Sequence, residues 1–123
     1  MSTRPKYLNL LQIRMPLPAL VSIMHRVSGA ALFLALPVLL CWWQASLVSA
    51  DTFASLKTAA SHWCVKLFAL ALLWGYLHHL CAGIRHLAMD VDVGTELAAA
   101  RLSSILVLVV SIALTVAIGA CLW

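Results

Sequence analysis

The stretch from Trp74 to His86 places imidazole and guanidinium groups inside an otherwise apolar segment. Ionisable groups cost free energy in hydrocarbon and usually serve a function there. In a helix, Gly75, His79 and Gly83 would share one face, because each lies four residues from the next. The His79 imidazole would then stand in a shallow groove without neighbouring side chains, where it could bind a metal ion.

Two interpretations fit a histidine in such a groove. A flat macrocycle such as haem could lie over the glycines with the His79 imidazole on its iron, since axial histidine holds haem iron. Alternatively, the glycines form a packing face and the histidine hydrogen-bonds to a neighbouring helix. His78 would point about 100° away from His79 and is the weaker ligand candidate. We expect Arg85 and His86, nearer the end of the segment, to snorkel toward lipid headgroups.

A second polar cluster opens the first apolar segment. Four of its residues follow the helical spacing i, i+3, i+4 and i+7 and therefore share one face: Ser22, His25, Arg26 and Gly29. Counted from Pro18, Arg26 would lie about 12 Å along the helix. A hydroxyl and a guanidinium one turn apart could bind a carbonyl or a carboxylate at the membrane boundary. An arginine that snorkels to lipid phosphate is the alternative.

The elements that carry these groups are those of a membrane protein. Of the 123 residues, 64% are hydrophobic and 10% are charged, whereas soluble domains are about 25% charged. From Val27 to Val48 no residue is charged, which is enough to cross about 30 Å of hydrocarbon. Pro37 should kink that span. We expect an all-α integral membrane protein with one domain over 1–123, an irregular arm over 1–17, spans at about 18–48, 63–89 and 102–123, and polar connections over 49–62 and 90–101.

The distribution of positive charge predicts the orientation. Six of the eight Lys and Arg residues flank either the start of the first span or the loop over 90–101, against Lys57 and Lys66 on the other side. Such an excess marks the cytoplasmic side, so we expect a cytoplasmic N-terminus. Four tryptophans fall at the outer ends of the spans, as an interfacial belt requires: Trp42, Trp43, Trp63 and Trp123. The chain shows neither a signal-peptide cleavage site nor an amphipathic presequence, which favours a retained span in a bacterial inner membrane.

Several classes of function are disfavoured. Blocks of Lys and Arg interleaved with aromatics are absent, so the net charge of +4 does not suggest nucleic-acid binding. No CxxCH motif occurs, which excludes a covalent c-type haem, and we expect the four cysteines to be small buried hydrophobes. No span carries a buried acidic residue of the kind that couples transport to ions. Because three helices cover a macrocycle poorly, we expect another chain to supply the second axial ligand of a b-type haem and its remaining walls.

Two separated motifs resemble a known family. The first includes Arg4-Pro5, Leu8, Ile13-Arg14 and Pro16 and ends with Ser22–Gly29; the second is His79–Asp90. With this order, chain length and number of spans, the chain resembles the cytochrome b membrane-anchor subunit of succinate dehydrogenase. The similarity extends over nearly the whole chain, although the third span adds little beyond its apolar character.

The resemblance implies an architecture and partners. Three transmembrane helices would form half of a heterodimeric, haem-binding helix bundle with a second anchor subunit. This pair would hold one haem b and dock an iron–sulfur subunit and a flavoprotein subunit. Electrons from succinate would pass through those subunits to ubiquinone near the cytoplasmic face, so this chain would not oxidise succinate by itself.

The resemblance also implies roles for individual residues. His79 would be the axial ligand of the haem iron that this subunit supplies. Ser22 and Arg26 would contact ubiquinone, and Asp90 would be a lesser candidate near the quinone. His25, together with Arg26, would lie near the haem propionates.

Two alternatives remain open from the sequence. An anchor subunit of a fumarate reductase, working with menaquinone, would carry similar motifs. A structural membrane protein would use the histidine face for packing alone. His78 beside His79 departs from the pattern of some relatives, and the flanking glycines favour His79 as the ligand.

Overall fold

The protein is described by a computed structural model over residues 14–123. In that part of the chain the structure consists of four α-helices and contains no strand: α1 (Leu17–Ser46), α2 (Ala50–Ser61), α3 (Trp63–Asp90) and α4 (Leu97–Leu122). Three of them, α1, α3 and α4, are long and apolar enough to cross a membrane. The all-α, three-span prediction is therefore confirmed, while most of the expected N-terminal arm lies outside the described residues.

Local sequence signals explain where the first helices begin. Pro16 immediately precedes α1, and Pro18 lies in its first turn, where the missing N–H has no helical partner to lose. Pro37 lies inside α1 without ending it. The Ser49 hydroxyl accepts a hydrogen bond from the Thr52 backbone N–H at 3.1 Å and so caps α2.

Two connections contain more helix than hydropathy indicates. Residues 49–62, expected to be a polar link, form the twelve-residue α2. α4 begins at Leu97, ahead of the expected apolar span, because the Leu-Ala-Ala-Ala run at 97–100 strongly favours helix. The α3–α4 turn is correspondingly short, and it uses the left-handed backbone of Asp92 and Gly94 (φ 61° and 76°). Hydropathy identifies the apolar segment that can lie in the hydrocarbon core of the membrane, whereas the helix extends beyond that segment.

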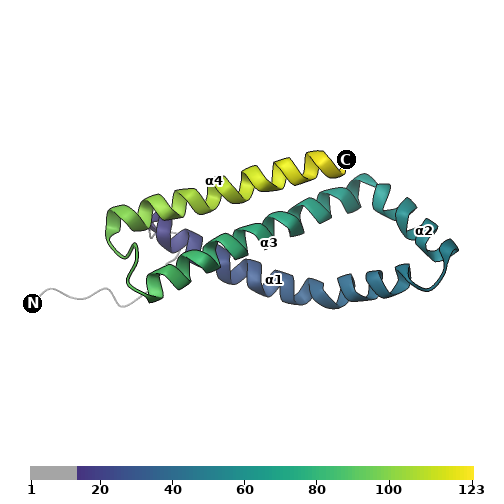
Figure 1. Ribbon diagram of the computed structural model, residues 1–123, viewed down its shortest axis with the longest axis horizontal. Coiled ribbons are helices and arrows are strands. Elements are labelled where there is room, and N and C mark those ends of the chain that lie inside the picture. The colour runs from purple at the N-terminus through teal and green to yellow at the C-terminus, as the bar shows by residue number, and fades with distance from the viewer. Residues whose placement is uncertain (1–13) are drawn as a thin grey trace, which may run out of the picture.

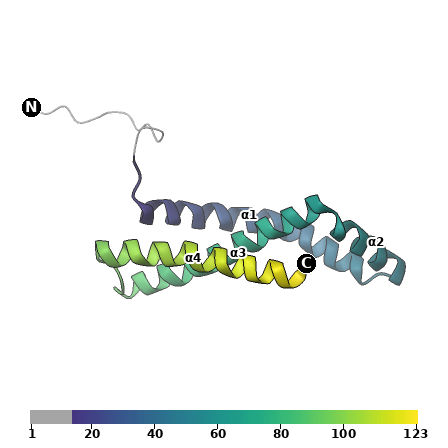
Figure 2. The same ribbon diagram turned by 90° about the horizontal axis from the view of Figure 1, so that it is seen from above.

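In the view of Figure 1 the helix α3 lies between α4 and α1, and it packs against both. Figure 2 shows that α1 and α4 also run side by side near the start of α1. Val21 of α1, Ala82 of α3 and Val107 of α4 form the small buried cluster where these helices meet. Within residues 14–123, five hydrophobic residues are buried, while Phe33 exposes 74% of its surface. So much exposed apolar surface requires lipid or another chain around it.

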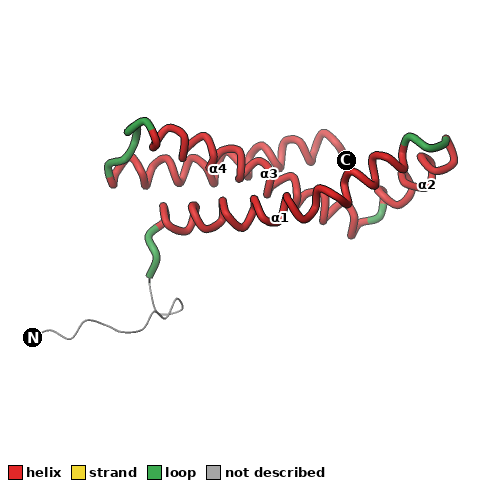
Figure 3. The backbone as a smooth tube through the Cα atoms, turned by 90° about the horizontal axis from the view of Figure 1, so that it is seen from below, coloured by secondary structure: helices red, strands yellow, loops and turns green. Residues whose placement is uncertain are grey.

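The two ends of the bundle differ in character. The start of α1 and the α3–α4 turn lie at one end, and α2 and the C-terminus lie at the other (Figures 1 and 3). Trp42 and Trp43 close to the end of α1, Trp63 at the start of α3 and Trp123 after α4 all belong to the α2 end. The structure therefore gathers these four tryptophans at one end, as predicted for an interfacial belt.

The cysteines are not the buried residues that the sequence suggests. All four are free thiols; Cys41, Cys64 and Cys121 are exposed, and Cys81 is half-buried. The expectation of burial is wrong for the three exposed residues, because they lie on surfaces that no other helix in the described part of the chain covers.

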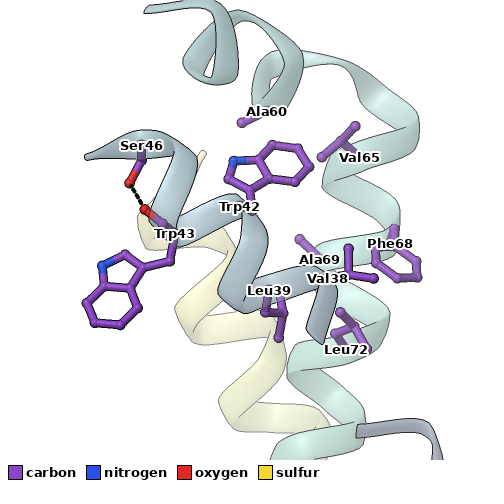
Figure 4. A pocket seen from close by; sticks show the side chains of 10 residues that line it. All are labelled: Val38, Leu39, Trp42, Trp43, Ser46, Ala60, Val65, Phe68, Ala69 and Leu72. Carbon is purple, nitrogen blue, oxygen red and sulfur yellow. Dashed lines mark hydrogen bonds between the residues drawn. The ribbon is translucent and has the colours of Figure 1, made fainter. Parts of the chain in front are cut away.

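An apolar cavity separates α1 from α3 near the α2 end, where these helices diverge (Figures 1 and 4). Its volume is about 420 Å³. In Figure 4 the Trp42 indole lies between the helices below Ala60, whereas the Trp43 indole points away. None of the residues that line the cavity is ionisable: Val38, Leu39, Trp42, Trp43, Ser46, Ala60, Val65, Phe68, Ala69 and Leu72. This cavity therefore offers no acid–base or metal chemistry, and the ionisable cluster lies elsewhere.

Candidate functional site

The packing of α1 against α3 brings the two sequence motifs together. The His25 and His79 rings are stacked, with centroids 4.2 Å apart and planes 15° apart. The His86 ring lies 5.0 Å from the His25 ring in a tilted arrangement. All three imidazoles are half-buried. Residues separated by more than fifty positions in the sequence thus form one imidazole cluster.

The Nδ1 atom of His79 is held by α1. It lies 3.0 Å from the backbone carbonyl oxygen of His25 and 3.2 Å from the Ser28 hydroxyl. A carbonyl oxygen only accepts hydrogen bonds, so Nδ1 carries the proton and donates it. With Nδ1–H as the donor, the ring nitrogen left to bind a metal is Nε2, which is the arrangement of a ligating histidine.

Glycines make room for these contacts. A Cβ atom at position 29 would approach the His79 Cε1 atom to 2.8 Å, so Gly29 is required for the close approach of the imidazole to α1. A Cβ atom at Gly83 would meet the His25 Nε2 atom at an ordinary 3.6 Å. At Gly75 a Cβ atom would meet nothing within 4 Å. Within residues 14–123, the face of α3 at Gly75, one turn from His79, is therefore open.

His78 has a different environment from its neighbour. It is 1% exposed, and neither of its ring nitrogens hydrogen-bonds to another residue in 14–123. Its ring lies 5.6 Å from that of Trp74, whose indole nitrogen also lacks a partner in this range. A ring enclosed in this way leaves no room for a macrocycle, so the geometry favours His79 as the ligand candidate.

The expected quinone contacts lie along the first turns of α1. Ser22 is half-buried and Arg26, one turn later, is exposed. No hydrogen bond joins either side chain to another residue within 14–123. Asp90 is the last residue of α3 and is exposed, without an ion pair to a Lys or Arg of the described range. The structure thus keeps Ser22 and Arg26 near each other but does not bring Asp90 into contact with them.

Arg85 does not snorkel, contrary to the expectation from the sequence. Its side chain is 7% exposed, and its Nε–H donates to the Ser103 hydroxyl at 2.9 Å. The guanidinium Nη2 also reaches the Ala100 carbonyl oxygen at 3.5 Å. The early start of α4 explains this difference, because the first turns of that helix lie beside Arg85. The arginine joins α3 to α4 instead of reaching the headgroups.

This contact leads to a stability prediction. We expect Ser103→Ala to lower the free energy of unfolding by about 1.5–3 kcal/mol, because the buried guanidinium loses a neutral acceptor. The measurement is the thermal denaturation midpoint of the detergent-purified protein with its native partners. Ser55→Ala is the matched control, since the exposed Ser55 hydroxyl bonds only to the Asp51 carbonyl in its own helix. Equal midpoints for the two variants would contradict a stabilising role of the Arg85–Ser103 contact.

Sequence spacing did not identify Ser28 or Gly29 as neighbours of His79. Both residues follow His25 and Arg26 closely in the same motif, and this closeness is the one feature of the sequence that could have marked them as part of the site. Spacing within a helix shows which residues share a face but not which residue of another helix they meet.

Comparison with known proteins agrees with the motifs. Residues 1–118 match the family described as "Succinate dehydrogenase/Fumarate reductase transmembrane subunit". The succinate dehydrogenase cytochrome b556 subunit of Coxiella burnetii is 38% identical over 122 residues, covering 98% of this chain and 97% of that protein. The proteins of the same name from Paracoccus denitrificans and Rickettsia felis are 35% and 32% identical, covering 92% and 91% of this chain and 87% of each relative. The chain therefore belongs to the family of transmembrane subunits of succinate dehydrogenase and fumarate reductase.

Proposed function

We propose that this chain anchors a succinate dehydrogenase in the membrane, binds one haem b through His79 and forms part of a ubiquinone-reduction site. The observation that carries the proposal is the His79 ring itself. Its Nδ1–H is fixed by the His25 carbonyl at 3.0 Å, which leaves Nε2 as the ligand atom. The curated relatives are named cytochrome b556 subunits, in agreement with a b-type haem.

The residues around His79 fit a haem. A Cβ atom at Gly75, one turn from His79, would meet nothing within 4 Å, so there is space beside the backbone at this point, whereas His78 is enclosed. His25 and Arg26 supply hydrogen-bond donors at the same end of α1 for the propionates. When bound, the haem supplies a one-electron carrier, while this chain supplies one ligand and part of the surrounding field. The second axial ligand would come from a partner anchor subunit, which would also cover the exposed apolar surface.

Ser22 and Arg26 would hold the quinone. The Ser22 hydroxyl can donate a hydrogen bond to one carbonyl oxygen, and the Arg26 guanidinium can polarise that oxygen. A cation whose orientation is set in advance stabilises negative charge that develops there better than water does. The exposed Arg26 side chain lies near the membrane boundary, where protons are available from water and the isoprenoid tail stays in lipid. Asp90 remains a weaker candidate for this site.

The charge distribution supports the proposed orientation in a bacterial inner membrane. Arg14, Arg26, Arg85 and Arg101 belong to the end opposite α2, whereas Lys57 and Lys66 belong to the α2 end. By the positive-inside tendency, the N-terminus faces the cytoplasm. The iron–sulfur and flavoprotein subunits would dock at that cytoplasmic end, close to Ser22 and Arg26.

Purification through a tag on this chain tests the proposal. The expected result is a complex with a second anchor subunit, an iron–sulfur subunit and a flavoprotein, with a b-type haem spectrum and succinate-dependent reduction of a ubiquinone analogue. A complex that carries menaquinone and reduces fumarate faster than it oxidises succinate would support the fumarate reductase alternative. Purification of the chain without haem and without succinate-oxidising subunits would contradict the proposal.

The open face of α3 gives a specific prediction. We expect Gly75→Leu to reduce the haem content of the purified complex at least about tenfold, because a Cβ atom at this position meets nothing within 4 Å in residues 14–123, whereas the leucine side chain would obstruct a macrocycle over His79. The measurement is the ratio of haem to flavin. Ala113→Leu on the exposed surface of α4 is the control for added apolar volume. A normal haem content in Gly75→Leu would place the macrocycle away from this face.

A further inference from the structure

We infer that Ser28 is a positioning residue for the axial ligand: its hydroxyl and the His25 carbonyl together hold the Nδ1–H of His79. The inference rests on the proposed haem ligation by His79. It adds a role for Ser28, and a role for the His25 backbone that does not depend on the His25 ring.

Three polar atoms form a closed triangle. The Ser28 hydroxyl donates to the His25 carbonyl oxygen at 2.9 Å, and His79 Nδ1 lies 3.0 Å from that oxygen and 3.2 Å from the hydroxyl. Because the hydroxyl proton is directed at the carbonyl, the lone pairs of Ser28 Oγ remain for the Nδ1–H. The imidazole proton is thus shared between two acceptors on the same turn of α1.

This triangle fixes both the tautomer and the orientation of the ring. A His79 ring with its proton on Nε2 would place a nitrogen lone pair against the carbonyl lone pairs of His25, which is unfavourable. Gly29 allows the ring to approach the α1 backbone, and the His25 ring stacks on it at 4.2 Å. Partners on the nitrogen that does not bind the metal orient a ligating histidine and raise its basicity. Ser28 would therefore act on the iron through His79.

The same helix offers a matched control. The Ser46 hydroxyl also donates to the carbonyl three residues earlier, that of Trp43, at 2.6 Å. Ser46 lies at the opposite end of α1 and lines the apolar cavity, far along the helix from the imidazoles. Removal of the hydroxyl at either position deletes the same local helix contact. Only the change at Ser28 removes an acceptor from His79.

The experiment compares Ser28→Ala, Ser28→Thr and Ser46→Ala in the complete complex. We expect Ser28→Ala to weaken haem retention about tenfold, the lower end of the effect of such supporting residues. We also expect a shift of the low-spin ferric haem signal in electron paramagnetic resonance, which reports ligand orientation. Ser28→Thr, which keeps the hydroxyl, should restore both properties. Ser46→Ala should match the unaltered complex in both.

Other outcomes would overturn the inference. Ser28→Ala with unchanged haem retention and an unchanged resonance signal would remove Ser28 from the ligand environment, as would equal losses in Ser28→Ala and Ser46→Ala. If Ser28→Ala fails to assemble, Ser28→Cys keeps the volume with a weak hydrogen-bonding group, and an unchanged signal in that variant would also overturn the inference. Retention of haem in His79→Ala would instead overturn the proposed ligation, so the two failures are distinguishable.

Discussion

His79→Ala should remove the b-type haem absorbance from the purified complex, whereas His78→Ala should retain it. The expected loss exceeds about 90% of the haem per flavin, because the axial ligand that we propose for this chain is deleted. His25, whose ring is stacked on that of His79, is the nearest other imidazole. His78 is 1% exposed and enclosed by the bundle, so we expect its removal to disturb packing and not haem binding. The optical spectrum of the reduced, detergent-purified complex measures both variants.

The pair of histidine variants separates ligation from packing. His78→Phe serves as a second control, because its somewhat larger ring keeps an aromatic group at this position without leaving buried nitrogens unpaired. We expect it to be at least as stable as the unaltered complex and to contain normal haem. The opposite result, haem lost in His78→Ala and kept in His79→Ala, would transfer the ligand role to His78. Haem kept in both variants would favour a purely structural histidine face.

The fold could be predicted from the sequence because lipid imposes a simple rule on it. A helix must offer some twenty apolar residues to cross hydrocarbon, and three segments of this chain do so. The same rule does not predict α2, because that helix does not cross the membrane. It also does not predict the helical structure of residues 97–100, which follows from their intrinsic helix propensity. Hydropathy thus determines the number of crossings, and propensity determines where the helices begin and end.

The candidate site could be predicted one helix at a time. Spacing placed Ser22, His25 and Arg26 on one face of the first span and His79 between two glycines of the second. Residue spacing within one helix could not predict the distances between helices, because those distances depend on small residues such as Gly29 at the contact.

For Arg85, the sequence of a single helix led to a wrong prediction. A lone arginine near a span end usually reaches the headgroups, and the sequence contains no sign that Ser103 would lie beside it. The contact exists because the short turn with Asp92 and Gly94 returns α4 directly alongside α3. Tertiary packing here overrides the preference of the isolated residue.

Arg26→Leu should lower succinate-dependent ubiquinone reduction about 100-fold, the effect typical of removing one preorganised donor from a developing oxyanion. Succinate oxidation with a soluble artificial acceptor should remain unchanged, because that reaction ends before the membrane. Arg26→Lys should retain part of the quinone activity, since the positive charge stays while the planar, forked donor set is lost. The measurement is steady-state turnover with each acceptor on the same purified complex, normalised to flavin.

Arg101→Leu is the control for a lost cation at the same end of the bundle. Arg101 is exposed on α4 and lies outside the Ser22–Arg26 face. We expect Arg101→Leu to keep both activities within twofold of the unaltered complex, whereas Ser22→Ala should lower quinone reduction in the same direction as Arg26→Leu. Parallel loss of both activities in Arg26→Leu would show that this guanidinium supports assembly of the complex. Such a result would contradict the proposed quinone contact of Arg26, because a contact residue affects the quinone reaction while leaving flavin chemistry intact.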